Sequence, residues 1–192
     1  MTSILEVEQL DTLSSNASST LTIGGTNTTT IAFGPNVTTT PSSLKNKYSF
    51  KAKLSGTQTG LTNDAFTKVS LASEDFDPDS KFNTSTYRYI PTEVGYYSLT
   101  GSVGIEQGGT NLRRSGVAIY KNGSAIAFNW IRLVDGNNII SEHYVSVNVV
   151  DYSSSTSDYY ELFAYQNNSA GNNNAVLSSS NARTYFTGFK LV

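Results

Sequence analysis

Apolar and polar residues alternate with a period of two along most of this chain, which restricts its fold to β-structure. The alternation is clearest in residues 47–54, where Tyr48, Phe50, Ala52 and Leu54 fall on one face and lysines and a serine on the other. Similar runs, bounded by turn-forming residues, occupy residues 65–71, 86–90, 95–105, 116–120, 124–133, 138–151, 158–166 and 182–192. No stretch shows the 3.6-residue period of a helix. About eight or nine strands with a turn roughly every dozen residues predict an all-β sandwich or jelly roll.

The composition supports a β-rich surface and argues against several classes of function. Charged residues make up only 15% of the chain, and Ser, Thr and Asn are abundant, which is typical of strands and turns. The net charge of −2 and the lack of a basic run argue against nucleic-acid binding. The chain has no cysteine and one histidine, which excludes disulfides, thiol catalysis and metal sites built from thiolates or clustered histidines. No apolar run is long enough for a transmembrane helix, so we expect no membrane insertion.

Residues 1–45 differ in character from the rest of the chain. Leu21 and Ile23 alternate with threonines there, Ile31 and Phe33 repeat the pattern, and a glycine follows each unit. So short a sheet cannot bury these four side chains by itself. The segment is therefore either a disordered linker or a stem in which several copies pool their apolar residues, and we favour a trimeric, triple-stranded β-stem.

This contrast predicts three parts. Residues 1–20 are an N-terminal attachment peptide, residues 21–45 are the β-repeat stem with a neck, and residues 46–192 are the head domain. The stem contacts between three copies would be Leu21, Ile23, Ile31 and Phe33.

Four segments of the head follow one another in a recognisable order. The matching residues are Phe82, Asn83, Tyr89, Pro91, Gly95 and Tyr97 in the central segment, Asn122 and Gly123 in the next hairpin, Asp158 at the penultimate strand, and Phe186, Gly188 and Phe189 in the closing strand. This order resembles the complement component 1q globular-head and tumour necrosis factor-like superfamily, over roughly residues 65–192. The resemblance implies a ten-strand jelly roll that forms a homotrimer and is not an enzyme.

Two departures from the superfamily point toward a virus. Ser157 stands where a glycine usually precedes the penultimate aspartate, and no collagen-like stalk precedes the head. In its place, TLTIGGTNTTTIAFG resembles the β-repeats in stems of bacteriophage and large-DNA-virus fibre proteins, and SILEVEQL resembles their short attachment peptides. The acidic N-terminus lacks the basic start of a secretory signal, which fits assembly inside a host cell. We therefore expect a fibre, spike or decoration protein on the virion surface, bound to a capsid or tail protein. The alternative is a secreted or cell-surface adhesion module.

Consecutive antiparallel strands place alternate loops at the same end of a jelly roll. The loops 106–114, 133–138 and 166–181 should therefore lie together at the tip, and the loops 121–124 and 151–158 at the stem end. The tip loops are long and rich in amides, which suits hydrogen bonding to sugar hydroxyls or to a receptor, although tolerant, mobile surface loops are the alternative. The candidate binding residues are Asn111, Arg113, Arg114, Asn137, Asn138, Asn172 and Asn173.

Other residues that could bind a metal or take part in catalysis have simpler structural interpretations. The acidic run at 73–80 could attract calcium, but it lacks the spacing of a calcium loop and is interpreted as a solvated turn, so we expect no cofactor. His143 is expected to be a structural histidine or one near an oligomer axis, because no nucleophile motif accompanies it. The carboxylate pairs Asp75 with Asp77 and Glu142 with Glu161 are candidates for a glycosidase pair, but nothing in the sequence places either in a cleft. Trp130 is interpreted as core or interface filler.

Overall fold

The computed structural model describes residues 47–107, 112–133, 141–179 and 183–191, and within these ranges the chain forms β-strands and turns. The residues of the expected stem and attachment peptide lie outside the described ranges, so those expectations stay predictions. The strands are β1 (Ser49–Lys53), β2 (Ala65–Lys68), β3 (Ser73–Phe76), β4 (Phe82–Asn83), β5 (Arg88–Tyr89), β6 (Gly95–Glu106), β7 (Leu112–Lys121), β8 (Ser124–Arg132), β9 (Glu142–Ser153), β10 (Tyr160–Asn168), β11 (Val176–Leu177) and β12 (Tyr185–Lys190).

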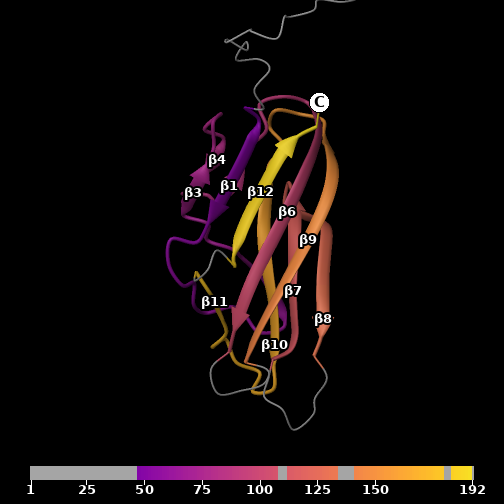
Figure 1. The fold of residues 1–192 in the computed structure, drawn as a ribbon. Coiled ribbons are helices and arrows are strands. Elements are labelled where there is room, and N and C mark those ends of the chain that lie inside the picture. Colours follow the sequence, from indigo (N-terminus) through magenta and orange to yellow (C-terminus); the bar gives the residue numbers. More distant parts are fainter. Residues whose placement is uncertain (1–46, 108–111, 134–140, 180–182, 192) are drawn as a thin grey trace, which may run out of the picture. The chain divides into compact units, whose positions relative to one another are not determined.

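Two sheets pack face to face, which confirms the predicted all-β sandwich (Figure 1). Sheet A has the order β3-β1-β12-β6-β9, and the short β11 pairs with the far end of β6. Sheet B has the order β4-β5-β10-β7-β8. The longest ladder joins β6 and β9, from Gly95 opposite Ser153 to Glu106 opposite Glu142. β9 and β8 are therefore edge strands of the two sheets, and the Asn129 side chain of β8 donates to the Ser146 carbonyl of β9 at 2.9 Å.

The core between the sheets holds alternate residues of each strand, as a period of two requires. Phe50, Tyr89 and Tyr97 are fully buried, and the rings of Phe50 and Tyr89 stack with centroids 4.1 Å apart. The Tyr97 hydroxyl donates to the Glu93 carbonyl at 2.8 Å, and the Tyr160 hydroxyl donates to Asp151 at 2.8 Å. Burial raises the pKa of Tyr97 to about 12, so the core tyrosines remain neutral at ordinary pH.

The ends of the sandwich follow the predicted topology (Figure 1). β12 ends beside the start of β1, with Ser49 opposite Phe189. The turn between β7 and β8 has positive φ at Asn122 (52°) and Gly123 (81°), which confirms the expected asparagine–glycine hairpin. The Asn122 side chain donates to Asp158 at 2.8 Å, which brings the loops 121–124 and 151–158 together at this end. The loops that follow β6, β8 and β10 begin at the opposite end, which we call the loop end.

The interpretation of residues 73–80 as a turn is wrong for its first half. Ser73–Phe76 is strand β3, which pairs with β1 at the edge of sheet A. Asp75 lies beside two lysines of β1, with Lys51 Nζ at 2.9 Å and Lys53 as its second partner. These ion pairs explain how an acidic segment is held in a strand. The chain does turn after β3, where the Ser80 amide donates to the Asp77 carbonyl at 3.0 Å.

Candidate functional site

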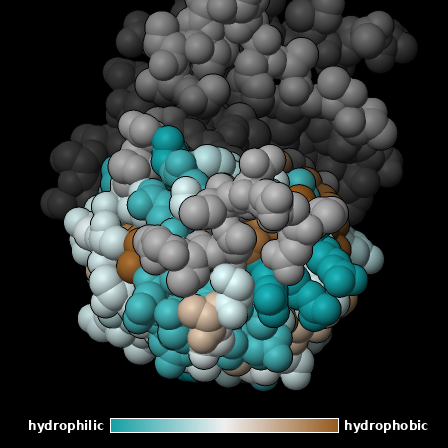
Figure 2. Space-filling view, turned by 90° about the horizontal axis from the view of Figure 1, so that it is seen from below, coloured by the Kyte–Doolittle hydropathy of each residue, from teal (hydrophilic) through white to brown (hydrophobic). Residues whose placement is uncertain are grey.

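Three loops meet at the loop end, as the strand order predicts. The Gln107 amide after β6 donates to the Ser141 carbonyl before β9 at 2.6 Å. The Leu133 amide after β8 donates to the Arg113 carbonyl at the start of β7 at 2.8 Å. The Gln107 side chain also reaches Asn172 in the loop after β10, at 3.4 Å. The described surface seen from this end is mainly hydrophilic (Figure 2).

Buried amide side chains support the loop that follows β10. Gln166 is fully buried and donates to the carbonyls of Leu61 and Asn172, each at 3.0 Å. Asn168 donates to the Gln166 side chain at 2.9 Å and to the Asn172 carbonyl at 2.7 Å. The side-chain oxygen of Asn168 accepts the amides of Ala170 and Asn172. The loop is thus held by a defined hydrogen-bond network.

The predicted tip residues have different roles in this arrangement. Asn172 is half-buried and its side-chain oxygen accepts from the Asn174 amide at 3.1 Å, and Asn173 accepts from the Asn63 amide at 2.7 Å. The side-chain oxygens of Asn172 and Asn173 therefore already accept hydrogen bonds from the protein backbone, and these are the atoms with which a ligand would bond. Asn111, Asn137 and Asn138 lie outside the described residues. The binding role assigned to these residues stays a prediction.

Arg113 lies at a bulge near the start of β7, where the ladder to β10 skips it, and Arg114 is the next residue, paired with Asn167. Arg113 is exposed, whereas Arg114 is half-buried on the outer face of the sheet. The Arg114 guanidinium lies 5.6 Å from the ring centroid of Trp130 on the neighbouring strand. Arg114, Trp130, Ile131 and Arg132 line an open hollow of about 400 Å³, which we call the arginine–tryptophan hollow.

Trp130 is not a core residue, since half of its surface is exposed. It lies opposite Gly116 on the outer face of sheet B, so the core alternative of the sequence-based interpretation is wrong, and the interface alternative stays a prediction. Arg132, which lies directly opposite Arg114, was not among the predicted site residues. An Arg two residues after a Trp on an alternating strand is the sequence signal that would have placed both side chains on one face.

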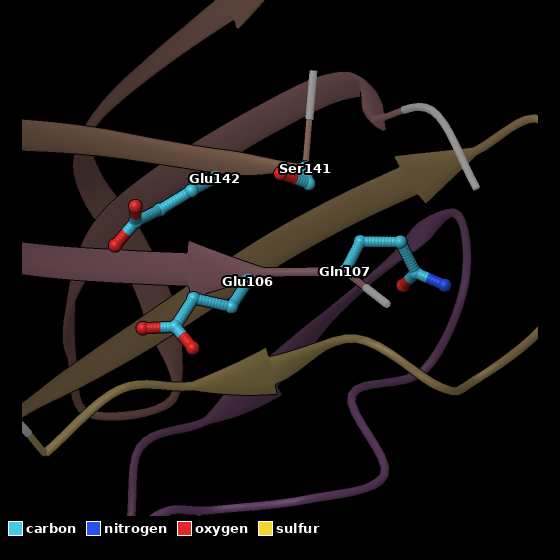
Figure 3. Close-up of a pocket in the computed structure, with 4 residues that line it drawn as sticks. All are labelled: Glu106, Gln107, Ser141 and Glu142. Atoms are coloured by element: carbon cyan, nitrogen blue, oxygen red, sulfur yellow. The ribbon is translucent and has the colours of Figure 1, made fainter. Parts of the chain in front are cut away.

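A second hollow, of about 280 Å³, opens at the loop end of sheet A and is acidic. It is lined by Glu106, Gln107, Ser141 and Glu142, and the two carboxylates lie on the same side of their paired strands (Figure 3). Arg183 Nη1 pairs with Glu142 and lies 3.9 Å from Glu106. The arginine thus neutralises part of the negative charge in this hollow.

The outer face of sheet A between this hollow and the opposite end carries no charged side chain on the described parts of β6 and β9. Its residues are Tyr96, Ser98, Thr100, Ser102 and Gly104 on β6, and Tyr144, Ser146, Asn148, Val150 and Tyr152 on β9. Tyr96 is 58% exposed, Val150 57% and Tyr152 48%, and the rings of Tyr96 and Tyr152 lie 5.0 Å apart. We call this surface the uncharged face.

The residues considered for catalysis are engaged in structural contacts. His143 Nδ1 lies 2.5 Å from the hydroxyl of Ser115, which is fully buried, and burial lowers the pKa of His143. Glu142 is in sheet A and Glu161 in sheet B, so they form no pair. Burial alone would raise the pKa of Glu161, but its bonds to Lys68 and Arg88, at 2.5 and 2.7 Å, lower it.

The other candidate carboxylate pair is also committed to the fold. Asp75 forms ion pairs with the two lysines of β1, and Asp77 accepts a hydrogen bond from the Phe82 amide at 2.6 Å. Among the described residues no three His, Cys, Asp or Glu side chains are grouped so that they could hold a metal ion. In the same ranges no helix is long and apolar enough to cross a membrane.

Solved structures with the same architecture belong to the tumour necrosis factor type. No protein-family model matches the chain, and no curated protein matches it. The chain is similar to the structure of Eiger TNF from S. frugiperda, with a TM-score of 0.55, 10% identity, and coverage of 75% of this chain and 90% of that one. It is also similar to crystal structures of murine APRIL, for example the one at pH 8.0, with a TM-score of 0.55, 12% identity, and coverage of 74% and 98%. The chain therefore has a tumour necrosis factor-like jelly-roll fold.

Proposed function

We propose that this chain is a non-enzymatic attachment protein that forms a homotrimer on the surface of a virion, as a fibre, spike or capsid-decoration protein. Its N-terminal peptide binds a capsid or tail protein, and its head is presented to a host-surface glycan or receptor. The stem-like repeat and the attachment-like peptide in residues 1–45 support the viral assignment.

The observation that carries the assembly is the uncharged face of sheet A. Exposed tyrosines and a valine lie along β6 and β9, whose own outward side chains between the acidic hollow and the opposite end are uncharged, whereas β1 and β3 in the same sheet carry lysines and an aspartate. Aromatic enrichment and charge depletion are typical of the buried centre of subunit interfaces. An elongated strip beside an edge strand suits a closed ring of copies in which each β9 lies near the symmetry axis.

The runner-up is a secreted or cell-surface recognition module that binds protein or carbohydrate outside the cell. The likeness to Eiger TNF and APRIL favours this alternative, because both are solved structures of the same fold and neither is described as a virion protein. Genes for capsid or tail proteins beside this gene would favour the virion protein, and their absence would favour the runner-up. A purified protein that hydrolyses glycans with robust turnover would contradict both.

Molar mass in solution tests the assembly directly. We expect light scattering of the full chain to give three times the mass of one 20.7 kDa chain. Val150→Asp should reduce it to the mass of one chain, because burying a carboxylate in an apolar interface is strongly unfavourable. Phe76→Asp is the matched control: Phe76 is 46% exposed on the same sheet but lies on β3, four strands from β9, and should leave the trimer intact. A monomeric wild-type chain, or a trimeric Val150→Asp variant, would contradict the assembly.

A further inference from the structure

A continuous set of aromatic side chains covers the outer face of sheet B, on the side of the sandwich opposite the uncharged face. The ring of Phe66 on β2 lies 5.3 Å from that of Tyr165 on β10, and the ring of Trp130 lies 5.7 Å from Tyr165 with an edge-to-face angle of 71°. Phe128 extends the set along β8, with its ring 6.1 Å from Trp130. Phe128 and Trp130 are 61% and 50% exposed, so this end of the set remains open to solvent.

Gly116 on β7 and Tyr165 on β10 fix the position of the Trp130 ring. Gly116 lies under it, and a Cβ added there would approach within 3.0 Å of the Trp130 Cβ and 3.4 Å of the Tyr165 Cβ. The absence of a side chain lets both rings rest on the sheet. The Tyr165 hydroxyl donates to Asp64, which fixes the ring that supports Trp130. A pre-positioned, half-exposed indole is suited to stacking against an apolar ligand face because little freedom is lost on binding.

Two arginines flank this indole. Arg114 and Arg132 lie directly opposite each other across the β7–β8 ladder, and neither forms an ion pair within the described part of the chain. Like charges directly opposite in an antiparallel ladder are destabilising. By contrast, Arg88 and Arg183 each pair with a glutamate. An anion bound between Arg114 and Arg132 would relieve the repulsion, and a guanidinium matches a carboxylate in a bidentate arrangement.

We propose that the arginine–tryptophan hollow is a binding site for a carboxylate-bearing saccharide. The carboxylate lies between Arg114 and Arg132, and the apolar face of the pyranose ring stacks on the exposed part of Trp130. The hollow, at about 400 Å³, falls within the size range of small-ligand sites, which is roughly 300–1,000 Å³. This inference deepens the proposed attachment function and rests on it for its biological role.

The site and the assembly surface do not compete for the same side chains. The uncharged face belongs to sheet A and the hollow to sheet B, and the outer faces of the two sheets of a sandwich point away from each other. Three heads would therefore offer three such sites, and weak single-site binding would become firm through multivalency.

Trp130 is the only tryptophan of the chain, so its fluorescence reports on this site alone. We expect 3′-sialyllactose, added to the full-length trimer, to change the emission saturably, and lactose at the same concentration to produce no change. Arg114→Gln and Arg132→Gln should each weaken the binding of 3′-sialyllactose at least tenfold. Lys53→Gln is the matched control, because it removes a cation from sheet A, away from the hollow, and should leave the affinity unchanged. Circular dichroism and light scattering establish that each variant is folded and trimeric.

Three results would overturn the proposal. The first is a folded wild-type protein whose emission does not respond saturably to 3′-sialyllactose. The second is full retention of affinity in the Arg132→Gln variant. The third is equal affinity for lactose, which would show that the carboxylate is not recognised, or for inorganic sulfate, which would show that the sugar ring is not recognised. A trimer that fails these tests would leave the proposed assembly standing, whereas a monomer that binds 3′-sialyllactose at Trp130 would leave the site standing without the assembly.

Discussion

Asp158 shows how one residue of the predicted motif stabilises the end of the sandwich where β1 begins. It is 6% exposed, and it accepts hydrogen bonds from the Asn122 side chain at 2.8 Å and from the Ser154 amide at 2.9 Å. Burial alone would raise its pKa, but these bonds, the nearby Lys121 ammonium and the Ser153 hydroxyl lower it to about 2. The aspartate therefore joins two loops at this end of the fold, which explains why it occupies the start of the penultimate strand.

Because the pKa of Asp158 is lower in the folded than in the unfolded chain, its stabilisation is present above the unfolded value of 3.8 and is lost as the pH falls toward 2. The shift corresponds to roughly 2 kcal/mol of unfolding free energy. Asp158→Asn should therefore destabilise the head by about that amount at neutral pH, with a difference that vanishes near the folded pKa. Urea denaturation at a series of pH values measures this, with the exposed Ser157→Ala as control. A constant difference at every pH would contradict the assignment.

Gly188 explains sterically why the closing strand has a glycine between two aromatic residues. A Cβ at this position would lie 2.6 Å from Leu99 Cδ2 and 2.9 Å from Phe50 Cε1, and both of those side chains are fully buried. Gly188→Ala should therefore lower the unfolding free energy by about 1–3 kcal/mol through overpacking. Gly56→Ala is the control, since nothing lies within 4 Å of its added Cβ. Equal midpoints of thermal unfolding for the two variants would show that the core can move aside.

At the scale of the strands, the sequence predicted the long elements and the two-residue β5, and it missed β3, β4 and β11. β6, β7, β8, β9, β10 and β12 each overlap a predicted run. β4 and β11 have two residues each, too few to display an alternation, and they are strands only because a partner strand lies beside them. β3 was missed because its acidic residues favour a turn when considered alone, and only the lysines of β1 compensate them.

The direction in which β8 faces could not be predicted from its alternation. Phe128 and Trp130 are the largest apolar residues of the strand, and such residues are most often buried. The register instead places Asn129 opposite the buried Val117, and the ladder shifts between Ile119 and Tyr120. Such a bulge reverses the faces that follow it. The alternation could place Trp130 and Arg132 on one face, but it could not show that this face is the outer one, and Arg114 was selected for a different reason.

Asn168 tests the hydrogen-bond network under the loop after β10. Asn168→Ala removes the hydrogen bonds donated to Gln166 and Asn172 and the two accepted from the amides of Ala170 and Asn172, in a site where Asn168 is 2% exposed. We expect a loss of about 2 kcal/mol of unfolding free energy and faster hydrogen exchange of the amides at 170–174. Asn174→Ala removes an exposed side chain of the same loop and should change neither. Unchanged exchange in Asn168→Ala would mean that the backbone alone orders the loop.

At the scale of the whole molecule, the two sheets present chemically different outer faces. Sheet A has a strip of exposed tyrosine and valine on β6 and β9, and sheet B has an aromatic set flanked by two arginines that form no ion pair with another described residue. A trimer whose subunits contact one another through sheet A would leave the outer face of sheet B exposed to solvent. Sheet A would then serve assembly and sheet B would serve recognition. This division requires that the head trimerises by itself and does not depend on the segment that precedes it.

The substitutions Ile23→Asp and Ile31→Asp together test that independence. They place carboxylates at two of the predicted stem contacts, where charges would repel if three copies met. Because the uncharged face lies entirely in residues 95–153, we expect the double variant to sediment as a trimer with a folded head and to lose protease resistance only before residue 46. Adding Val150→Asp should then reduce the sedimenting species to a single chain. A monomeric double variant would instead mean that the stem holds the copies together and that the tyrosine strip on sheet A serves another partner.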